Sequence, residues 1–278
     1  MTEISLPKHA RLAITVNVLT EWWGDHGKLP GSEYPNQCLG STREYGARTG
    51  YKYITKVLKK NSVKASAMFN GILAEKFPEV VRTFADDGHE IVGHSYDQAK
   101  AMYLLTKDEE KATIKRCTKL LEEAGGRRPL GWSSAQRSCT PHTLEILMDE
   151  GFVWDGDLGD TDLPYPIEKN GKRIMMVPSG VVCTDLEEFM LFDREGHRQT
   201  LRGCKEALDF MVAQFNGAYS LATPSSPLRM SLGWHSFVAG KPDYVWALDR
   251  FIRYAKEHKG VVFVTNLELA QWWLQNCV

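Results

Sequence analysis

The residues best suited to acid–base chemistry stand near the ends of predicted strands. Glu21 follows the first apolar run, His94 ends the segment GHEIVGH, and His235 ends the segment MSLGWH. Histidine and carboxylate side chains can take a proton from water and deliver one to a leaving group. Where strands run parallel, residues at their carboxyl ends gather at one face of the fold. The joint placement of these residues therefore predicts a site for general acid–base hydrolysis.

Each of these residues, taken alone, also has a structural explanation. Glu21 could pair with Arg43 or Arg48 in the following loop, and His89 at the start of its strand is expected to be structural. The segment 155–162 contains four aspartates and is explained equally well as a solvated turn. Only the occurrence of several such residues at different strand ends favours a catalytic site.

The elements that must position these residues alternate between short apolar runs and helical segments. The first run, LAITVNVL at residues 12–19, is continuous and rich in β-branched residues, which is typical of a strand buried on both faces. Residues 24–50 are rich in Gly, Pro, Asn and Ser, and are predicted to form a long loop. The remaining predicted strands are 64–69, 88–94, 130–133, 152–154, 231–235 and 261–264, and the predicted helices are 51–61, 72–87, 106–124, 141–150, 205–215, 244–258 and 267–275.

Strand followed by helix, repeated about seven times, predicts parallel strands joined by crossover helices. Both a barrel and an open doubly wound sheet satisfy this pattern. No GxGxxG follows the first strand and no GxxxxGK[ST] is present, so dinucleotide-binding and phosphate-binding loops are disfavoured. Thr106 and Glu109 form a capping-box pattern, and Pro78 is suited to open a second helix within 72–87. Because there is no repeat or linker, a single domain over residues 1–278 is expected.

The composition of the chain excludes several classes of protein. The 278 residues include 34 Lys and Arg against 35 Asp and Glu, for a net charge of −1, and 43% are hydrophobic. This balance gives no basic surface for nucleic acid or an anionic membrane, and no apolar run reaches the roughly 20 residues of a membrane-spanning helix. The amino terminus has no pattern of a secretion signal, and six cysteines are scattered without a CxxC pair. We therefore expect a cytoplasmic enzyme with reduced thiols that acts on a small molecule.

Longer stretches of the chain match a known family. The segment VKASAMFNGILAEKFPEVVRTFADDGHEIVGHSYDQ resembles the homology region of the polysaccharide deacetylases, carbohydrate esterase family 4. The later segments GGRRPLGW, EGFVWDGDLGDTDLPY and SLGWHSFVAGKP are most similar to the metal-independent allantoinases and related cytosolic amide and imide hydrolases. The resemblance covers roughly residues 10–275. It implies an α/β fold, a distorted parallel (β/α) barrel of about seven strands, and relatives that often assemble as homo-oligomers.

The sequence departs from the metal-dependent members of this family at their ligand positions. Those members carry T-F-D-x-D-x-E in the first strand and H-[ST]-x-x-H after the third, which supply a base and the metal ligands. Here Asn17 and Leu19 stand at the two aspartate positions, and Gln98 replaces the second histidine. A catalytic zinc usually takes three protein ligands, and only His94 of that set is present. We expect no family metal site and no cofactor, although a replacement site that uses Asp97 or the acidic turn stays open.

Without a metal, one side chain must activate water and another must protonate the leaving nitrogen. Glu21 and His94 are the candidate bases, and His235, which matches the late histidine of the family, is the candidate proton donor. Such a site suits ring opening of a small cyclic amide, imide or ureide, as in the allantoinase-like members. One alternative is a carbohydrate deacetylase with a rearranged metal site. Another is a pseudoenzyme that binds a small ligand, which Asn17 at the position of the base keeps open.

The same motifs give candidates for substrate binding. Arg137 stands where the allantoinase-like members have an arginine, whose fork of donors could hold a carboxylate or a polarised carbonyl. Its alternative role is a surface ion pair with the acidic turn. Asn17, Asp157 and Asp162 are further polar candidates. The aromatic candidates, which would line a flat apolar pocket or else pack in the core, are Trp22, Trp132 and Trp234, together with Trp23 and Trp154.

Overall fold

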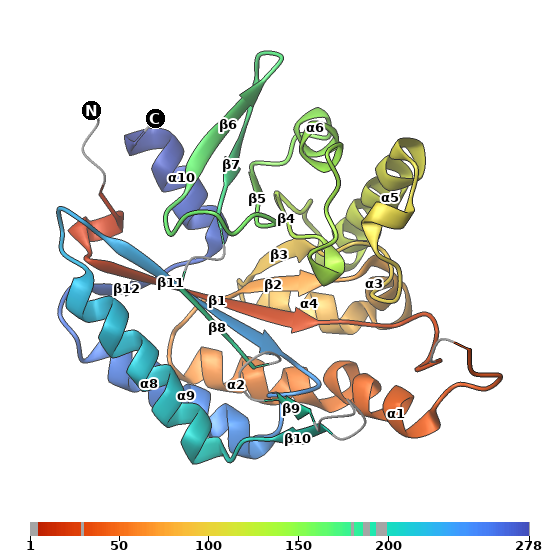
Figure 1. Ribbon diagram of the computed structural model, residues 1–278, viewed down its shortest axis with the longest axis horizontal. Helices are drawn as coiled ribbons and strands as arrows, with labels where there is room; N and C mark the ends of the chain where they lie inside the picture. Colours follow the sequence, from red (N-terminus) through yellow and green to blue (C-terminus); the bar gives the residue numbers. More distant parts are fainter. Residues whose placement is uncertain (1–4, 29–30, 179–180, 186–189, 193–198, 278) are drawn as a thin grey trace.

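The computed structural model describes residues 5–28, 31–178, 181–185, 190–192 and 199–277. Its centre is a curled sheet that forms half of a barrel, with the order β6-β7-β5-β4-β3-β2-β1-β11-β8, and β12 pairs with the first part of β1 (Figure 1). The paired strands run parallel except β6 and β7, which are antiparallel. The strands of this sheet are β1 (Leu12–Thr20), β2 (Ser66–Phe69), β3 (Glu90–Gly93), β4 (Gly131–Trp132), β5 (Trp154–Asp155), β6 (Tyr165–Lys169), β7 (Lys172–Met176), β8 (Val181–Thr184), β11 (Leu228–His235) and β12 (Val261–Phe263); β9 (Met190–Phe192) and β10 (Gln199–Leu201) form a separate antiparallel pair.

Helices cover the convex side of the sheet. In Figure 1, α8 and α9 lie side by side along β11 and β12, and α3, α4 and α5 pack near β2 and β3. The last helix, α10, packs instead on the concave side, where its residues Leu269 and Trp273 belong to a cluster with Trp154 and Met175. The helices are α1 (Gln37–Tyr45), α2 (Tyr51–Lys60), α3 (Gly71–Lys76), α4 (Pro78–Asp86), α5 (Lys107–Gly125), α6 (Thr143–Asp149), α8 (Cys204–Leu221), α9 (Pro242–Lys256) and α10 (Asn266–Asn276).

The predicted barrel of parallel strands is confirmed, and both local helix signals are confirmed with it. Thr106 caps α5 in a capping box with Glu109, and α4 begins at Pro78. The predicted loop over residues 24–50 is wrong in its second half, where α1 and a π-helix, η2 (Gly46–Gly50), are found. The hairpin of β6 and β7 was also not expected, because its strands are rich in charged residues and lack an apolar run.

The two faces of the sheet follow the alternation of side chains along each strand. On β11, Met230 and Trp234 point into the core beneath the helices, whereas Ser231 and His235 line a cavity on the concave side. The centre of the sheet, β1, obeys the same rule, since its apolar even-numbered residues belong to the core and Asn17 lines the cavity. Each strand therefore sends alternate residues to the core and to the concave face.

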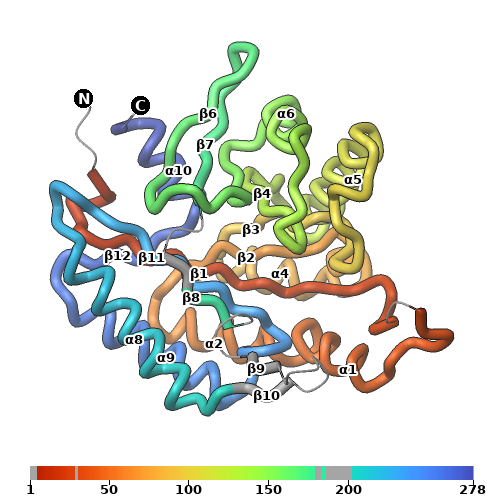
Figure 2. The backbone as a smooth tube through the Cα atoms, viewed as in Figure 1, coloured from red at the N-terminus to blue at the C-terminus, as the bar shows by residue number. Residues whose placement is uncertain are grey.

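Residues near the two ends of the chain lie side by side, as the tube in Figure 2 also shows. Trp272 of α10 donates a hydrogen bond from its indole Nε1 to the carbonyl oxygen of Ser5, at 3.0 Å. All six cysteines are free thiols, in agreement with the prediction. Among the described residues, no helix combines the length and the apolar character that crossing a bilayer requires.

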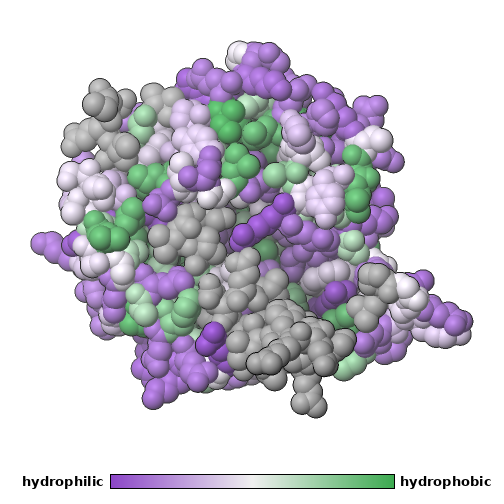
Figure 3. All heavy atoms as spheres, viewed as in Figure 1, coloured by the Kyte–Doolittle hydropathy of each residue, from purple (hydrophilic) through white to green (hydrophobic). Residues whose placement is uncertain are grey.

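The surface in Figure 3 carries apolar side chains in several separate groups between broad hydrophilic areas. The large exposed apolar residues are likewise spread over different elements, with Tyr103 and Leu104 after β3, Leu221 at the end of α8 and Trp246 on α9. Scattered apolar residues of this kind are normal on a protein surface. The expected homo-oligomer stays a prediction.

Candidate active site

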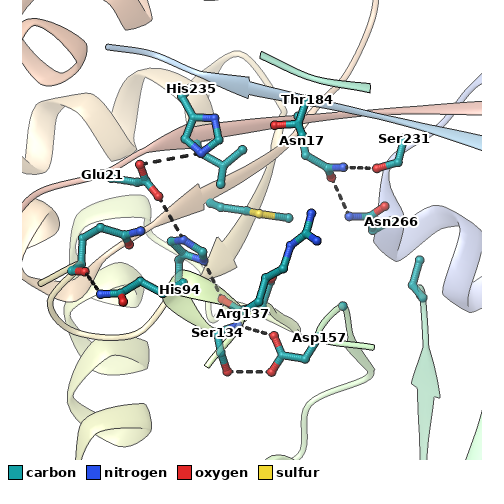
Figure 4. Close-up of a pocket in the computed structure, with 18 of the residues that line it drawn as sticks. Asn17, Glu21, His94, Ser134, Arg137, Asp157, Thr184, Ser231, His235 and Asn266 are labelled. Carbon is teal, nitrogen blue, oxygen red and sulfur yellow. Dashed lines mark hydrogen bonds and ion pairs between the residues drawn. The ribbon is translucent and has the colours of Figure 1, made fainter. Parts of the chain in front are cut away.

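A cavity of about 340 Å³ opens at the carboxyl ends of β1 and β11, on the concave side of the sheet. Figure 4 shows polar side chains from β1, β11 and the segments after β3, β4 and β5 pointing into it. Three of these side chains, Glu21, His94 and His235, are the catalytic residues predicted from the sequence, and all three line the cavity. The structure therefore brings together groups that lie up to 214 residues apart in the chain.

Glu21 lies between the two histidines. Its Oε1 is 3.3 Å from Nε2 of His94, and its Oε2 is 3.9 Å from Nε2 of His235. The three side chains are 3%, 5% and 9% exposed, respectively, so they meet in a largely dehydrated environment. Electrostatic interactions between such groups are stronger than they would be in water.

The other ring nitrogen of each histidine faces an acceptor. Nδ1 of His94 is 2.6 Å from the carbonyl oxygen of Ser133, and Nδ1 of His235 is 2.6 Å from Oδ1 of Asp185. Both acceptors require a proton on Nδ1. Each imidazole therefore presents Nε2 to Glu21 and the cavity, which is the nitrogen that can exchange a proton with a substrate or water. Asp185 also accepts a hydrogen bond from the backbone N–H of His235 at 2.7 Å, so it fixes this residue twice.

The surroundings of Glu21 favour its ionised form. Burial alone would raise the pKa of the carboxyl group, but the facing imidazoles of His235 and His94, together with Arg43, more than offset this effect. The pKa of Glu21 consequently lies below its ordinary value. The cavity thus holds a carboxylate that is bracketed by two imidazoles.

Asp157 lines the cavity as predicted, but its oxygens already have partners. Its Oδ2 accepts a hydrogen bond from the hydroxyl of Ser134 at 2.6 Å, and its Oδ1 accepts from the backbone N–H of Ser134. Burial raises the pKa of Asp157. Burial also raises the pKa of Asp155, and the neighbouring charge of Asp157 raises it further. Asp157 therefore holds the segment after β4 in place. Asp162, in contrast, is exposed and does not line the cavity, so its predicted place in a substrate site is wrong.

Arg137 lines the mouth of the cavity, and Figure 4 shows its side chain extending from the segment after β4 toward the central space. Gln136 and Arg137 both have left-handed backbone conformations, with φ of 57° and 52°, and Ser95, next to His94, has φ of 57°. Residues other than glycine adopt this region at a steric cost, and such residues often cluster at functional sites. Three of the eight described non-glycine residues with positive φ therefore lie beside the cavity.

Three of the predicted aromatic residues do not line the cavity, and their neighbours explain why. Trp22 follows Glu21 and points away, where its ring packs on Phe77 with centroids 4.8 Å apart. Trp132 and Trp234 directly precede the cavity-lining Ser133 and His235, so alternation turns both into the core, where they are fully buried. The aromatic residues that do line the cavity are Trp23, Trp154 and Phe237.

Several residues of the site were not predicted from the sequence. Asp185, which lies behind His235 and contacts it at 2.6 Å, is in a segment without a useful motif. Arg229, Ser231 and Asn266 line the cavity. The alternation in RMSLGWH could have indicated Arg229 and Ser231, because residues two, four and six positions before His235 share its face of the strand.

The residues at the family's ligand positions do not fit a metal ion. Leu19 offers no lone pair, Gln98 accepts a hydrogen bond from Asn70 through Oε1, and both ring nitrogens of His94 have protein partners. Asp97 binds the backbone N–H groups of Gly24 and Ala99. Within the described ranges, no group of three or more His, Cys, Asp or Glu is placed to hold a metal ion.

Comparison with known proteins finds similarity to polysaccharide deacetylases. The sequence pattern of the polysaccharide deacetylases matches residues 31–153. The peptidoglycan deacetylase of Helicobacter pylori is 21% identical over 286 residues, which cover 94% of each chain. The peptidoglycan-N-acetylglucosamine deacetylase of Bacillus cereus is 33% identical over 173 residues, which cover 60% of each chain. Residues 31–153 therefore match the polysaccharide deacetylases, and the resemblance seen in the sequence is confirmed.

Two solved structures share the fold over almost the whole chain. PuuE allantoinase has a TM-score of 0.84 at 26% identity, covering 98% of this chain and 93% of its own. A probable polysaccharide deacetylase from Pseudomonas aeruginosa has a TM-score of 0.84 at 26% identity, covering 98% of this chain and 94% of its own. The chain therefore shares its fold with a probable polysaccharide deacetylase and with an allantoinase.

Proposed function

We propose that this protein hydrolyses a C–N bond in a small cyclic amide, imide or ureide, and that it does so without the metal ion of the deacetylases. The observation that carries the proposal is the position of the Glu21 carboxylate between Nε2 of His94 and Nε2 of His235. Both histidines have their Nδ1 atoms held by fixed acceptors, so their Nε2 atoms are ready to move protons.

In the proposed reaction, the pair of Glu21 and His94 takes a proton from water as the water oxygen attacks the carbonyl carbon. The C–N bond of the tetrahedral intermediate then breaks, and His235 gives its Nε2 proton to the leaving nitrogen. Asp185 stabilises the protonated imidazole of His235 through Nδ1, the role that a buried carboxylate plays in other hydrolases. The ring opens to a carboxylic acid and an amine or amide, and the proton taken from water restores His235. Arg137 is the candidate donor for the oxyanion, a contribution typically worth about 3 kcal/mol of the barrier.

The cavity suits a small ring. Its volume of about 340 Å³ is at the lower end of the range for small-molecule sites. Trp23, Trp154 and Phe237 supply flat apolar surface among the polar groups. The similarity to an allantoinase, a cyclic ureide hydrolase by its name, supports this substrate class. The departures from the metal-binding pattern at Asn17, Leu19 and Gln98 weigh against sugar deacetylation by the family's usual route.

A substrate panel tests the proposal: allantoin, hydantoin, succinimide and 2-pyrrolidinone as rings, and N-acetylglucosamine oligomers as the deacetylase alternative. We expect ring opening of at least one cyclic compound. Glu21→Gln is expected to lower its rate by 10³-fold or more, since a positioned base contributes roughly 10²- to 10⁴-fold and the charge between the histidines is also lost. Glu44→Gln, which changes a carboxylate outside the cavity that pairs with Arg48, is the control and should keep the wild-type rate.

The outcomes separate the alternatives. Sugar deacetylation that a chelator abolishes would establish the rearranged metal site instead. Tight binding of a ring compound without turnover would establish a pseudoenzyme. A Glu21→Gln variant with the wild-type rate would mean that the reaction takes place elsewhere.

A further inference from the structure

A series of hydrogen bonds connects Arg229, Asn266, Asn17 and Ser231 along the cavity wall at the end away from Glu21. Nη2 of Arg229 donates to Oδ1 of Asn266 at 2.9 Å, and Nδ2 of Asn266 donates to Oδ1 of Asn17 at 2.8 Å. Nδ2 of Asn17 then donates to the hydroxyl oxygen of Ser231, also at 2.8 Å. Figure 4 shows the last three residues in contact at the cavity wall.

The direction of this series is fixed by its first member. A guanidinium group only donates hydrogen bonds, so the atom of Asn266 that faces it must be the oxygen. The amide nitrogen of Asn266 therefore faces Asn17, and the same reasoning turns the nitrogen of Asn17 toward Ser231. The oxygen of Ser231 is thus occupied as an acceptor. Its O–H hydrogen stays available as a donor, and the hydroxyl of Ser231 has no other hydrogen-bond partner within the described residues.

Among the described residues, no carboxylate pairs with the buried guanidinium behind this wall. Arg229 is 1% exposed, and its acceptors are the carbonyl oxygen of Pro178, the hydroxyl of Thr15 and Asn266. Among the described residues its Nε has no partner. Burial lowers the pKa of Arg229 to about 10, so the group is still charged at neutral pH. A buried charge without a counter-charge is unfavourable, and a bound anion would supply the missing partner.

The wall therefore has two properties that point to the same ligand: hydrogen-bond donors directed at the cavity and a positive charge behind them. The Glu21 end of the cavity differs, because its carboxylate is already balanced by imidazoles. Strands rise about 3.3 Å per residue, so the Cα atoms of Ser231 and His235 lie roughly 13 Å apart along β11. A ligand that reaches both ends must carry its anionic group on a side arm, away from the reacting carbonyl.

We propose that Ser231 and Asn17, with the Arg229 guanidinium behind them, bind a carboxylate of the substrate. This inference rests on the proposed function and narrows its substrate class to cyclic amides, imides or ureides that carry a carboxylate on a short side arm. When Ser231 and Asn17 hold the carboxylate, the ring is oriented so that its scissile carbonyl lies beside Glu21, His94 and His235.

Two ligands of the same shape test the charge requirement: 5-(2-carboxyethyl)hydantoin and its neutral carboxamide. Binding is measured by calorimetry on Glu21→Gln, which should not open the ring, so the result does not depend on turnover. We expect the carboxylate to bind at least 10-fold more tightly than the carboxamide. Ser231→Ala in the same background should reduce this preference to 3-fold or less. Ser225→Ala, an exposed serine in the loop before β11, should leave it unchanged.

Arg229→Met tests the charge itself and has a matched control. Arg11 resembles Arg229, because its guanidinium binds the carbonyl oxygens of Tyr219 and Ala222 and its Nε also has no partner among the described residues, yet it does not line the cavity. Arg229→Met should abolish the preference for the carboxylate, and Arg11→Met should retain it. If Arg229→Met does not fold, Ser231→Ala decides the question.

Equal affinity for the two ligands, binding of neither, or an undiminished preference in Ser231→Ala would overturn the proposal. These results are independent of the proposed reaction. If the protein prefers the carboxylate but opens no ring, the proposed carboxylate site is supported and the proposed hydrolase activity is contradicted.

Discussion

The two faces of the curled sheet carry opposite chemistry on the same strands. Along β11, Met230, Leu232 and Trp234 are fully buried against the helices, while Arg229, Ser231 and His235 line the cavity from the alternate positions. The convex face gains its stability from apolar burial. The concave face instead buries charged and polar groups, which is unfavourable unless each finds a partner. Folding alone does not require such a face, so its polar residues indicate function.

The largest expected effect lies on the convex face. Trp234→Ala should lower the free energy of unfolding by about 3–5 kcal/mol, because a fully buried indole is removed and a cavity is left. The hydrogen bond from its Nε1 to the carbonyl oxygen of Ala239, at 2.9 Å, is lost as well. Urea denaturation followed by circular dichroism measures the change.

Trp246→Ala is the matched control, since Trp246 on α9 is 42% exposed. It should cost less than about 1 kcal/mol, as expected for a surface site. If Trp234→Ala were no more costly than this control, or if it weakened ligand binding without lowering stability, Trp234 would belong to the cavity face after all.

This contrast also explains what the sequence could predict. The apolar runs and the capping signals located most of the sheet and its helices, because burial on both faces leaves a strong pattern in 12–19 and 231–235. Glu21, His94 and His235 could be predicted because they stand at strand ends. Proximity in sequence to those residues predicts that Trp22, Trp132 and Trp234 line the cavity, but alternation turns Trp132 and Trp234 into the core and Trp22 packs on Phe77.

Other parts of the site leave no local signal. Asp185 contacts His235 across 50 residues of sequence, and nothing in its neighbourhood distinguishes it from a surface aspartate. Asn266 reaches the cavity only because α10 packs on the concave side. Contacts of this kind depend on how the strands and helices are arranged in space, which residue spacing does not reveal.

A smaller effect is expected from Glu90, a carboxyl group buried on the concave face. It accepts hydrogen bonds from Ser66 and Trp154, at 2.6 and 2.7 Å, and from the backbone N–H of Leu267. Burial outweighs these bonds and raises its pKa from 4.5 to about 7. Between these two pH values the folded protein binds more protons than the unfolded chain, so stability falls as pH rises. The contribution is roughly 3 kcal/mol, present below pH 4.5 and lost above pH 7.

Glu90→Gln removes this titration. Relative to wild type, the variant should gain roughly 3 kcal/mol of unfolding free energy between pH 4 and pH 8. Urea denaturation at the two pH values gives the difference. Glu257→Gln, an exposed glutamate at the end of α9, is the control and should follow wild type at both. A constant gap between Glu90→Gln and wild type would show that folding does not raise the pKa of Glu90.

The smallest effect is expected from Asp185→Asn, which tests whether Asp185 supports proton donation by His235 or only holds His235 in place. Asp185→Asn keeps an acceptor for His235 but removes the charge that stabilises its protonated ring. We expect kcat for ring opening to fall about 10²-fold, equivalent to about 2.7 kcal/mol of barrier, with little change in KM. The upper limb of the pH–rate profile should move to lower pH, because the imidazolium loses its proton more easily without the carboxylate.

The leaving group provides the decisive comparison. An imide nitrogen leaves with the help of its second carbonyl, whereas a lactam nitrogen needs a proton as the bond breaks. Asp185→Asn should therefore slow a lactam more than an imide if His235 donates that proton. Asp160→Asn, on the exposed acidic turn beside Tyr165, should alter neither rate. An equal loss for both substrates, without a shift of the pH profile, would assign Asp185 to holding the end of β11 in place rather than to supporting proton transfer.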